Sequence, residues 1–259
     1  MSENERPLVS IVTPVYNAGS YIAGTIESVL AQDCDNWELI LVDDLSTDNS
    51  VSVIEGFLTD TRIRLVRGTR KLGAAKARNE GIKIARGGYL TFLDADDLWK
   101  ETKLSRQLAF LKRNHAAFSF TSYEFGDTDA RPTGRIVHAP EKLNYRQALS
   151  RTVIFTSTVM FRLSESGSAT ALSKTDCFFP DCPSEDTALW WRILRSGYSA
   201  AGLDEVLTVY RRPSGSLSSN KLTAIKRIWN LYRREEGFNI LKSARYFIPW
   251  AVRATLRRL

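Results

Sequence analysis

The chain has 259 residues, 43% hydrophobic and 25% charged, a composition that excludes wholesale disorder and suits one α/β domain with or without an appendage. Its net charge of +7 comes from the end of the chain: residues 221–259 hold ten Lys or Arg and two Glu, net +8, so the rest sums to −1. This distribution disfavours a nucleic-acid-binding body and indicates a specialised basic tail, so no nucleic-acid partner is expected.

The first half of the chain alternates apolar, β-branched runs with stretches of helical periodicity. Strands are predicted at residues 8–13, 37–42, 62–66 and 89–93, and helices at residues 20–32, 47–58 and 74–85. We expect Pro14 to end the first strand and Ser20 to cap the first helix. This order predicts right-handed βαβ units and an α/β fold with a mostly parallel sheet.

The second half is less regular. A helix is predicted at residues 103–112, strands at 118–123, 156–161 and 207–210, and a further helix at 186–195. Residues 222–259 have a helical pattern that we expect Gly237 and Pro249 to interrupt. Because residues 1–7 are polar and no apolar run approaches about 18 residues, we expect neither a signal peptide nor a spanning helix, and a cytoplasmic location.

Three cysteines, Cys34, Cys177 and Cys182, are too few and too poorly spaced for a disulfide framework or a zinc site. We expect them to be reduced thiols.

Polar motifs follow three of the predicted strands. Residues Thr13 to Asn17 follow the first strand, Asp43 and Asp44 the second, and residues 94–97 the fourth. Ligands of parallel α/β sheets bind at the carboxyl ends of the strands, so these motifs are expected to converge there.

Two acidic motifs could carry chemistry. Asp94 and Asp96 flank the small residue Ala95 at a strand end and could share one Mn²⁺ or Mg²⁺ ion that neutralises a departing nucleoside diphosphate. Acidic turns after strands are also common without any such role. Glu185 and Asp186 begin a predicted helix, where a carboxylate can be a cap or a general base for an acceptor hydroxyl.

Five motifs taken together resemble the family 2 glycosyltransferases, which have the glycosyltransferase A-type fold. In chain order these motifs are residues 14–19, 42–48, 73 with 77–81, 93–97 and 185–190. The resemblance covers about residues 7–218 and extends to small bacterial capsule, teichuronic-acid and lipopolysaccharide-type transferases. Each motif alone is modest, whereas five in this order and spacing are specific.

The resemblance implies roles for individual residues. Tyr16 would stack on the nucleotide base, Asp44 or Asp43 would hydrogen-bond to the base, and Arg78 would lie near the base and ribose. Asp94 would approach the ribose, and Asp96, with Asp94, would ligate the metal. Asp186 would be the catalytic base and Glu185 would orient it or bind acceptor. Further donor-binding positions are Thr13, Pro14, Asn17, Gly73, Ala95, Arg211, Arg212 and Ser216. The alternatives are a core aromatic for Tyr16 and a surface salt bridge for Arg78.

Some relatives carry a histidine in the loop near residue 212 that joins the metal shell, but both histidines here, His115 and His138, lie upstream. The third protein ligand of the metal is therefore open, and we expect Arg211 or Arg212, with Ser216, to bind phosphate instead.

The resemblance implies a catalytic domain at residues 1–220, with a nucleotide-binding half at 1–99 and an acceptor-binding half at 100–220. In residues 221–259, aromatic and apolar side chains alternate with Lys and Arg, which favours an amphipathic helix on an anionic membrane. The alternative is a helix packed on the catalytic domain with a solvated charged face.

The expected function is transfer of a sugar, with inversion, from a nucleotide-sugar, with UDP expected, to a hydroxyl of a glycan or lipid-linked glycan acceptor. The setting would be bacterial surface polysaccharide synthesis at the cytoplasmic face of the plasma membrane. The alternative is an inactive relative that binds glycan or acts as a scaffold in a synthase complex. The absence of Gly-x-Gly-x-x-Gly after the first strand disfavours a dinucleotide-dependent oxidoreductase. The uncharged loop there also disfavours a nucleotidyltransferase.

Overall fold

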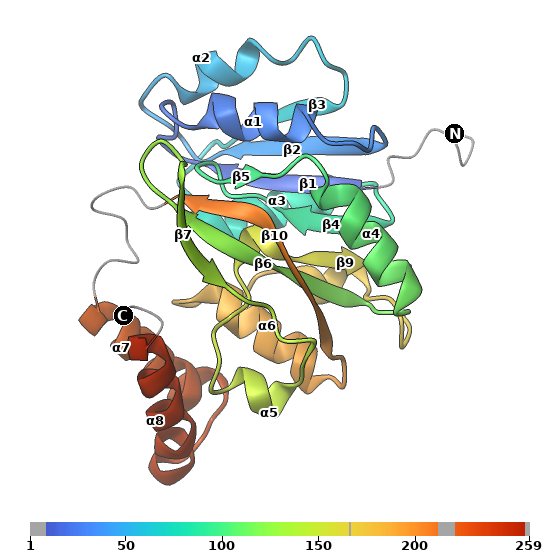
Figure 1. Cartoon of the computed structure of the whole chain (residues 1–259). Coiled ribbons are helices and arrows are strands. Elements are labelled where there is room, and N and C mark those ends of the chain that lie inside the picture. Colours follow the sequence, from blue (N-terminus) through green and yellow to red (C-terminus); the bar gives the residue numbers. More distant parts are fainter. Residues whose placement is uncertain (1–8, 166, 212–220, 257–259) are drawn as a thin grey trace.

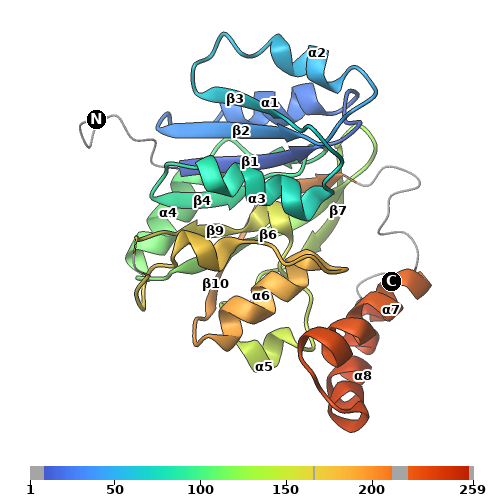
Figure 2. The same cartoon turned by 180° about the vertical axis from the view of Figure 1, so that it is seen from behind.

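The computed structural model of the chain describes residues 9–165, 167–211 and 221–256, which form one ten-stranded sheet with helices on both faces (Figures 1 and 2). Its first half is parallel, with strand order β3-β2-β1-β4. The strands are β1 (Val9–Val15), β2 (Trp37–Asp43), β3 (Ile63–Arg67) and β4 (Tyr89–Phe92). The connecting helices are α1 (Ile22–Leu30), α2 (Ser50–Glu55) and α3 (Ala74–Ile84). The chain reverses its direction of growth between β1 and β4, which is where sheets of this kind bind ligands.

The second half of the sheet is mixed. From β4 the order continues β9-β6-β10-β5, with β7 on β6 and β8 on β10. These strands are β5 (Leu98–Trp99), β6 (Phe118–Gly126), β7 (Pro132–Val137), β8 (Lys142–Leu143), β9 (Met160–Arg162) and β10 (Ala200–Arg211). Strand β9 runs antiparallel to both of its neighbours, and β10 runs parallel to β6. The helices are α4 (Lys103–Arg113), α5 (Tyr145–Ala148) and α6 (Glu185–Arg195), with 3-10 turns at Thr156–Thr158 and Lys174–Cys177.

Two local predictions are corrected. Pro14 does not end β1, which continues to Val15. The Val15 carbonyl accepts from the Asp44 N–H and the Val12 carbonyl accepts from the Leu93 N–H, so the missing N–H of Pro14 would point toward β4, beyond the last paired residue on that side. The proline therefore breaks no ladder hydrogen bond. Residues 156–158, expected in a strand, form the 3-10 turn.

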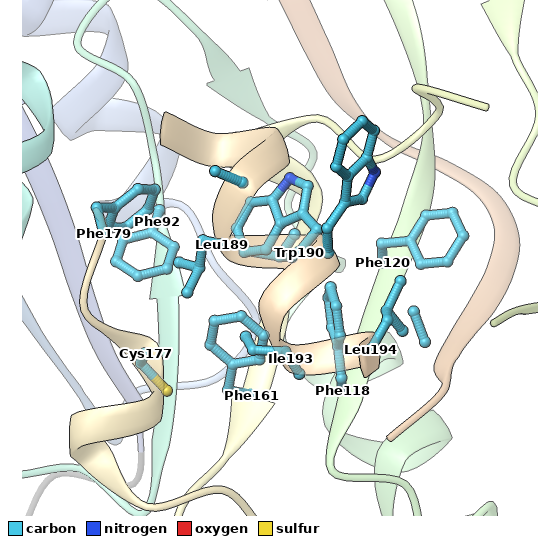
Figure 3. Close-up of a cluster of buried hydrophobic side chains, with 14 of the residues drawn as sticks. Phe92, Phe118, Phe120, Phe161, Cys177, Phe179, Leu189, Trp190, Ile193 and Leu194 are labelled. Carbon is cyan, nitrogen blue, oxygen red and sulfur yellow. The ribbon is translucent and has the colours of Figure 1, made fainter. Parts of the chain in front are cut away.

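Alternate residues of the central strands enter two hydrophobic clusters, one on each face. Val9, Ile11, Leu39 and Leu41 pack with α1 and α4, which lie in front of the sheet in Figure 1. Val12, Ile40, Val42 and Phe92 pack with α3 and α6, which lie in front of it in Figure 2. Figure 3 shows the centre of the second cluster, where Trp190 of α6 lies among phenylalanine rings, with ring centroids of Trp190 and Phe118 5.6 Å apart. Packing of α6 on the sheet fixes its N-terminal residues, Glu185 and Asp186.

The basic tail contains α7 (Lys221–Asn230), a π-helical turn (Leu231–Glu235) and α8 (Ile240–Leu256). Gly237, with φ of 63°, separates the last two as expected. Pro249 does not interrupt α8. The carbonyl that its missing N–H would bind belongs to Arg245, whose side chain is exposed, so water can satisfy that group.

The aromatic face of the tail packs on the catalytic part of the chain. Tyr232 stacks on Trp191 of α6 with ring centroids 5.1 Å apart, and its hydroxyl donates to the Leu149 carbonyl. Trp250 is buried, and its Nε1 donates to Thr152 Oγ1 at 3.1 Å. The sequence pattern favours an aromatic face on a bilayer, whereas Tyr232 and Trp250 contact protein. The side chains left exposed on α8 include Leu241, Ile248 and Val252.

Within the described residues, no helix is both long and apolar enough to cross a membrane. The three cysteines are free thiols, as predicted, and Cys177 is buried beside α6.

Candidate active site

Strand ends β1 and β2 carry an exposed aromatic ring beside two buried carboxylates. The Tyr16 side chain is 51% exposed, and the Lys71 ammonium group lies over its ring. Asp44 is buried and accepts hydrogen bonds from the backbone N–H groups of Leu72 and Gly73, the latter at 2.9 Å. Lys71 also approaches Asp44, with Nζ 3.8 Å from Oδ2. Tyr16 is therefore not a core aromatic but a half-exposed ring at the sheet edge, covered in part by a lysine that the sequence motifs do not include.

The conformation of this edge is held by short polar links. The Asn17 backbone has φ of 48°, which asparagine tolerates better than most residues, and its Oδ1 accepts from the Thr47 N–H at 2.8 Å. Asp43 accepts from the Ser46 N–H at 3.2 Å. Gly73 is the N-cap residue of α3 and has a φ of 81°, a conformation that a β-carbon would strain. Tyr16 and Asp44 are thus presented by fixed backbone.

Arg78 of α3 joins the two acidic motifs. Its guanidinium group lies 2.5 Å from Asp94 Oδ1 and 3.4 Å from Glu185 Oε1. The Arg78 side chain is 7% exposed, and the two carboxylates are each about a quarter exposed. Burial lowers the pKa of Arg78, but the opposing pull of Asp94 and Glu185 leaves that pKa above its ordinary value. Arg78 is neither a surface salt bridge nor a free ligand but a buried bridge between the β4 edge and α6.

Beside this bridge, Asp186 is partly buried at the start of α6. Its Oδ1 accepts from the Thr187 N–H at 2.6 Å. Burial first, and then the charge of Glu185, raise the pKa of Asp186 above the usual 3.8. A carboxylate with a raised pKa holds a proton more readily, which is the property that a general base requires.

A hydrogen-bond network of Ser157 and Asp97 holds the Asp94 motif in place. The Ser157 hydroxyl donates to Asp97 Oδ2 at 2.6 Å and accepts from the Asp94 N–H at 3.0 Å. The other oxygen of Asp97 accepts from the Arg211 N–H at 3.1 Å. Burial, together with the charges of Asp94 and Asp96, raises the pKa of Asp97 well above its ordinary value. This network ties the β4 edge to the 3-10 turn and to the end of β10.

Arg211 is buried at the end of β10 and stands close to the same carboxylates. Its guanidinium carbon lies 4.8 Å from the ring centroid of Tyr21, and its Nη1 donates to the Thr128 carbonyl. Its positive charge lowers the pKa of Asp96, against the larger opposing effects of burial and of Asp94.

A cavity of about 460 Å³ opens beside these groups. Its lining includes the acidic motifs and their bridge: Arg78, Asp94, Glu185 and Asp186. Its walls come from the second half of the chain and from the tail. They comprise Tyr123, Phe125, Arg135, Val137, Thr152, Phe155, Thr156, Ser184, Thr187, Tyr210, Ala224, Arg227, Ile228, Trp250 and Ala254. The cavity is therefore bounded by both acidic motifs and by the C-terminal helices.

Comparison with known proteins identifies this arrangement. Residues 10–165 match the family described as "Glycosyl transferase family 2". The chain belongs to this family. It is 40% identical over 258 residues, 99% of either chain, to the "Putative teichuronic acid biosynthesis glycosyltransferase TuaG" of Bacillus subtilis. It is 37% identical, over 87% of this chain and 86% of the relative, to the Escherichia coli "UDP-Glc:alpha-D-GlcNAc-diphosphoundecaprenol beta-1,3-glucosyltransferase WfaP".

Solved structures agree on the fold. The mannosyltransferase PcManGT of Pyrobaculum calidifontis, in complex with GDP-Man and Mn²⁺, superposes with a TM-score of 0.70 at 19% identity, covering 96% of this chain and 74% of that chain. S. aureus TarS in complex with UDP-GlcNAc gives a TM-score of 0.67 at 19% identity, covering 94% and 71%. Both the predicted family and the predicted glycosyltransferase A-type α/β fold are confirmed.

The donor set of this family 2 member fits a hard divalent cation. Burial and the charge of Asp94 raise the pKa of Asp96 to about 6, and Asp96 has no ion pair among the described residues, so a cation would relieve the repulsion. Mg²⁺ and Mn²⁺ are commonly held by one or two carboxylates and by substrate phosphates. No group of three or more His, Cys, Asp or Glu placed to hold a metal occurs in the described part of the chain, so a third protein ligand is not identified.

Two of the predicted donor residues, Arg212 and Ser216, lie outside the described residues. Thr13 is fully buried at the same edge. Pro14 is partly buried and Ala95 is buried at the same edge. Ser157, Lys71 and the arginines of the cavity wall were missed by sequence reasoning. Lys71 could have been found because it immediately precedes the Leu72-Gly73 start of a motif, but no local signal marks Ser157.

Proposed function

We propose that this protein is an inverting, metal-dependent glycosyltransferase that moves a sugar from a UDP-sugar to a hydroxyl of a glycan or lipid-linked glycan acceptor. The process would be bacterial surface polysaccharide synthesis. The observation that carries the proposal is the Arg78 bridge, which brings the Asp94 motif and the α6 motif together in the lining of one cavity. A donor held at Asp94 and an acceptor in the cavity would meet beside Asp186.

In this proposal Asp186 is the general base. It removes the proton from the acceptor hydroxyl as that oxygen attacks the anomeric carbon of the donor sugar, and the nucleoside diphosphate leaves from the opposite face, which gives inversion. The raised pKa of Asp186 and its contact with the Thr187 N–H suit that role. Glu185 is engaged by Arg78 and positions the base motif rather than taking the proton.

The donor would be held by residues 1–99. Tyr16 offers an exposed ring on which the nucleotide base would stack. Beside it, Asp44 or Asp43 would hydrogen-bond to the base. Asp94 would lie near the ribose, and Arg211, with Arg212 and Ser216, near the diphosphate. A Mn²⁺ or Mg²⁺ ion held by Asp96 and Asp94 would neutralise charge on the leaving diphosphate.

UDP is proposed as the nucleotide because the name of the Escherichia coli relative WfaP specifies UDP-Glc and TarS has been crystallised with UDP-GlcNAc. The name of WfaP also specifies a diphosphoundecaprenol-linked acceptor, and that of TuaG specifies teichuronic acid biosynthesis. These names support an acceptor of the bacterial envelope, bound by residues 100–220.

The tail, residues 221–259, is proposed to hold the enzyme at the cytoplasmic face of the plasma membrane. Leu241, Ile248 and Val252 are exposed and spaced by seven and four residues, which places them on one face of α8. Lys242 and Arg245 are exposed on the same helix and could approach anionic head groups. This surface differs from the aromatic face that packs on α6.

Thermal unfolding with a panel of nucleoside diphosphates, with and without Mn²⁺, tests the donor site. A ligand that binds only the folded state must raise the melting temperature. We expect a rise with UDP that requires Mn²⁺ and is absent in Asp96→Ala. The donor assignment fails if no nucleotide shifts the transition while the protein is folded, and the scaffold alternative then gains support.

A further inference from the structure

The lining of the cavity also contains two arginines that the proposed chemistry does not use. Arg135 comes from β7 and Arg227 from α7, so they lie about 90 residues apart in sequence but line one cavity. Both side chains are partly buried. Arg135 lies over the Phe125 ring at 5.4 Å, and neither guanidinium forms an ion pair within the described residues.

Two partly buried guanidinium groups without carboxylate partners repel each other and lose hydration, so their presence in one cavity calls for an anion. Arginine suits phosphate in particular, because its planar fork can donate two parallel hydrogen bonds to phosphate oxygens. The same cavity is lined by Asp94 and Asp186, whose negative charges would repel an anion and so favour its binding at the two arginines.

The remaining lining has two kinds of surface. Phe125, Phe155 and Tyr210 form part of a packed aromatic group, with the Phe155 and Tyr210 ring centroids 4.3 Å apart. Such rings offer flat faces for a sugar ring. Next to Arg227 on the tail, Ile228 and Trp250 add an apolar wall that suits a hydrocarbon chain.

We infer that Arg135 and Arg227 form a subsite for the diphosphate of a lipid-linked acceptor, and that the C-terminal helices complete the acceptor site rather than only anchor the protein. This inference rests on the proposed function and deepens it. In the bound acceptor, the sugar lies along the aromatic group with its hydroxyl at Asp186. The diphosphate lies between the two arginines, and the first part of the lipid lies against Ile228 and Trp250.

The test measures binding of decyl diphosphate to the full-length protein in EDTA, below the micelle concentration of the lipid, by titration calorimetry. We expect Arg135→Gln and Arg227→Gln each to weaken binding about tenfold, the loss expected for a charge-assisted contact. The matched control is Lys226→Gln, which removes a positive charge from the exposed neighbouring residue of α7 and should leave the Kd unchanged. Melting curves verify that each variant is folded.

Three further arms separate the sources of the anion. Inorganic diphosphate and uncharged decyl glucoside should each bind more weakly than decyl diphosphate, and equal affinity for either would overturn the inference. Binding of a glucuronate-bearing oligosaccharide should be the same in the wild type and in both arginine variants. If the arginine substitutions weaken only the binding of this oligosaccharide, the assignment of the subsite to diphosphate is overturned. Identical decyl diphosphate binding in the wild type and both arginine variants would also overturn it.

Stabilisation by UDP and Mn²⁺, measured in the same four proteins, keeps the two proposals distinct. Intact UDP binding with arginine-independent decyl diphosphate binding would refute the subsite alone. Absence of UDP binding in the wild type would refute the proposed function.

Discussion

The donor side and the acceptor side of the candidate active site are built from different kinds of contact. On the donor side, carboxylates are fixed by backbone amides or buried partners: Asp44 by Leu72 and Gly73, and Asp97 by Ser157 and Arg211. On the acceptor side, the wall includes aromatic rings and two arginines that have no acidic partner in the described part of the chain, contributed by β6, β7, β10 and the C-terminal helices. Fixed polar groups suit a constant nucleotide, whereas a broad aromatic and cationic wall suits a large, amphiphilic acceptor.

This difference between the two sides predicts that substitutions on the donor side lower turnover strongly. Asp96→Ala should lower turnover more than about a hundredfold, because it removes a carboxylate proposed to hold the metal against the leaving diphosphate. Release of nucleoside diphosphate from a UDP-sugar measures the effect. Asp181→Ala is the matched control, since Asp181 is exposed and pairs with Lys76 outside the cavity. Near-normal turnover in folded Asp96→Ala would remove this residue from the mechanism.

Acceptor-side substitutions should change acceptor affinity and leave the donor site intact. Tyr210→Ala removes a ring that packs on Phe155 and should raise the KM for acceptor about tenfold, with UDP stabilisation unchanged. The KM values for the two substrates are measured separately. An effect of equal size on the donor KM would show that the two sides are not independent.

The membrane surface of α8 can be separated from its packed face. Leu241→Ser with Ile248→Ser should weaken co-sedimentation with anionic liposomes by more than about tenfold, since burying each apolar side chain contributes about 1.5–3 kcal/mol. Because both residues are exposed, the melting temperature should not fall. A deletion from Lys242 onward would be a poorer test, as it also removes Trp250 and its contact with Thr152. Unchanged co-sedimentation of the double variant would show that this face of α8 does not bind the membrane.

The smallest predicted effect is a change in the melting temperature when Asp186, the proposed general base, is replaced. Because burial raises the folded-state pKa of Asp186, the protonated form is favoured, and that stability is lost as pH rises from about 3.8 through the raised pKa. Asp186→Asn carries no charge to desolvate and keeps an acceptor for the Thr187 N–H. Its melting temperature should exceed that of the wild type by a few degrees at pH 8, with the difference shrinking toward pH 4. A variant less stable than the wild type at pH 8 would contradict this account of the burial.

Sequence patterns were most informative where structure is local. The βαβ order and the helix at Ala74–Ile84 follow from periodicity and turn residues that lie within a few positions of each other. The prediction that Pro14 ends the first strand was wrong, because the effect of a proline depends on where the neighbouring strand β4 stops pairing. The prediction of a strand at residues 156–158 was wrong, because the β-branched composition of a strand occurs here in a 3-10 turn. In this turn the Ser157 hydroxyl accepts a hydrogen bond from the Asp94 N–H.

Long-range assembly explains what the sequence could not supply. The alternation in the tail predicts an amphipathic helix correctly, but not whether protein or lipid meets its aromatic face, and Tyr232 and Trp250 meet protein. Likewise, Arg78 was predicted as a donor residue from its motif, whereas its bridge to Glu185 joins positions 107 residues apart. The cavity wall pairs β7 with α7, which no spacing in the sequence indicates.

The most direct test of the central claim, that the two acidic motifs meet at a catalytic base, compares wild type and Asp186→Asn for nucleoside diphosphate release and for UDP affinity. The account predicts turnover lowered more than about a hundredfold with the UDP Kd unchanged, because a general base contributes about 10²–10⁴ and does not hold the nucleotide. Near-normal turnover in Asp186→Asn would contradict it, as would a loss of activity fully explained by weaker UDP binding.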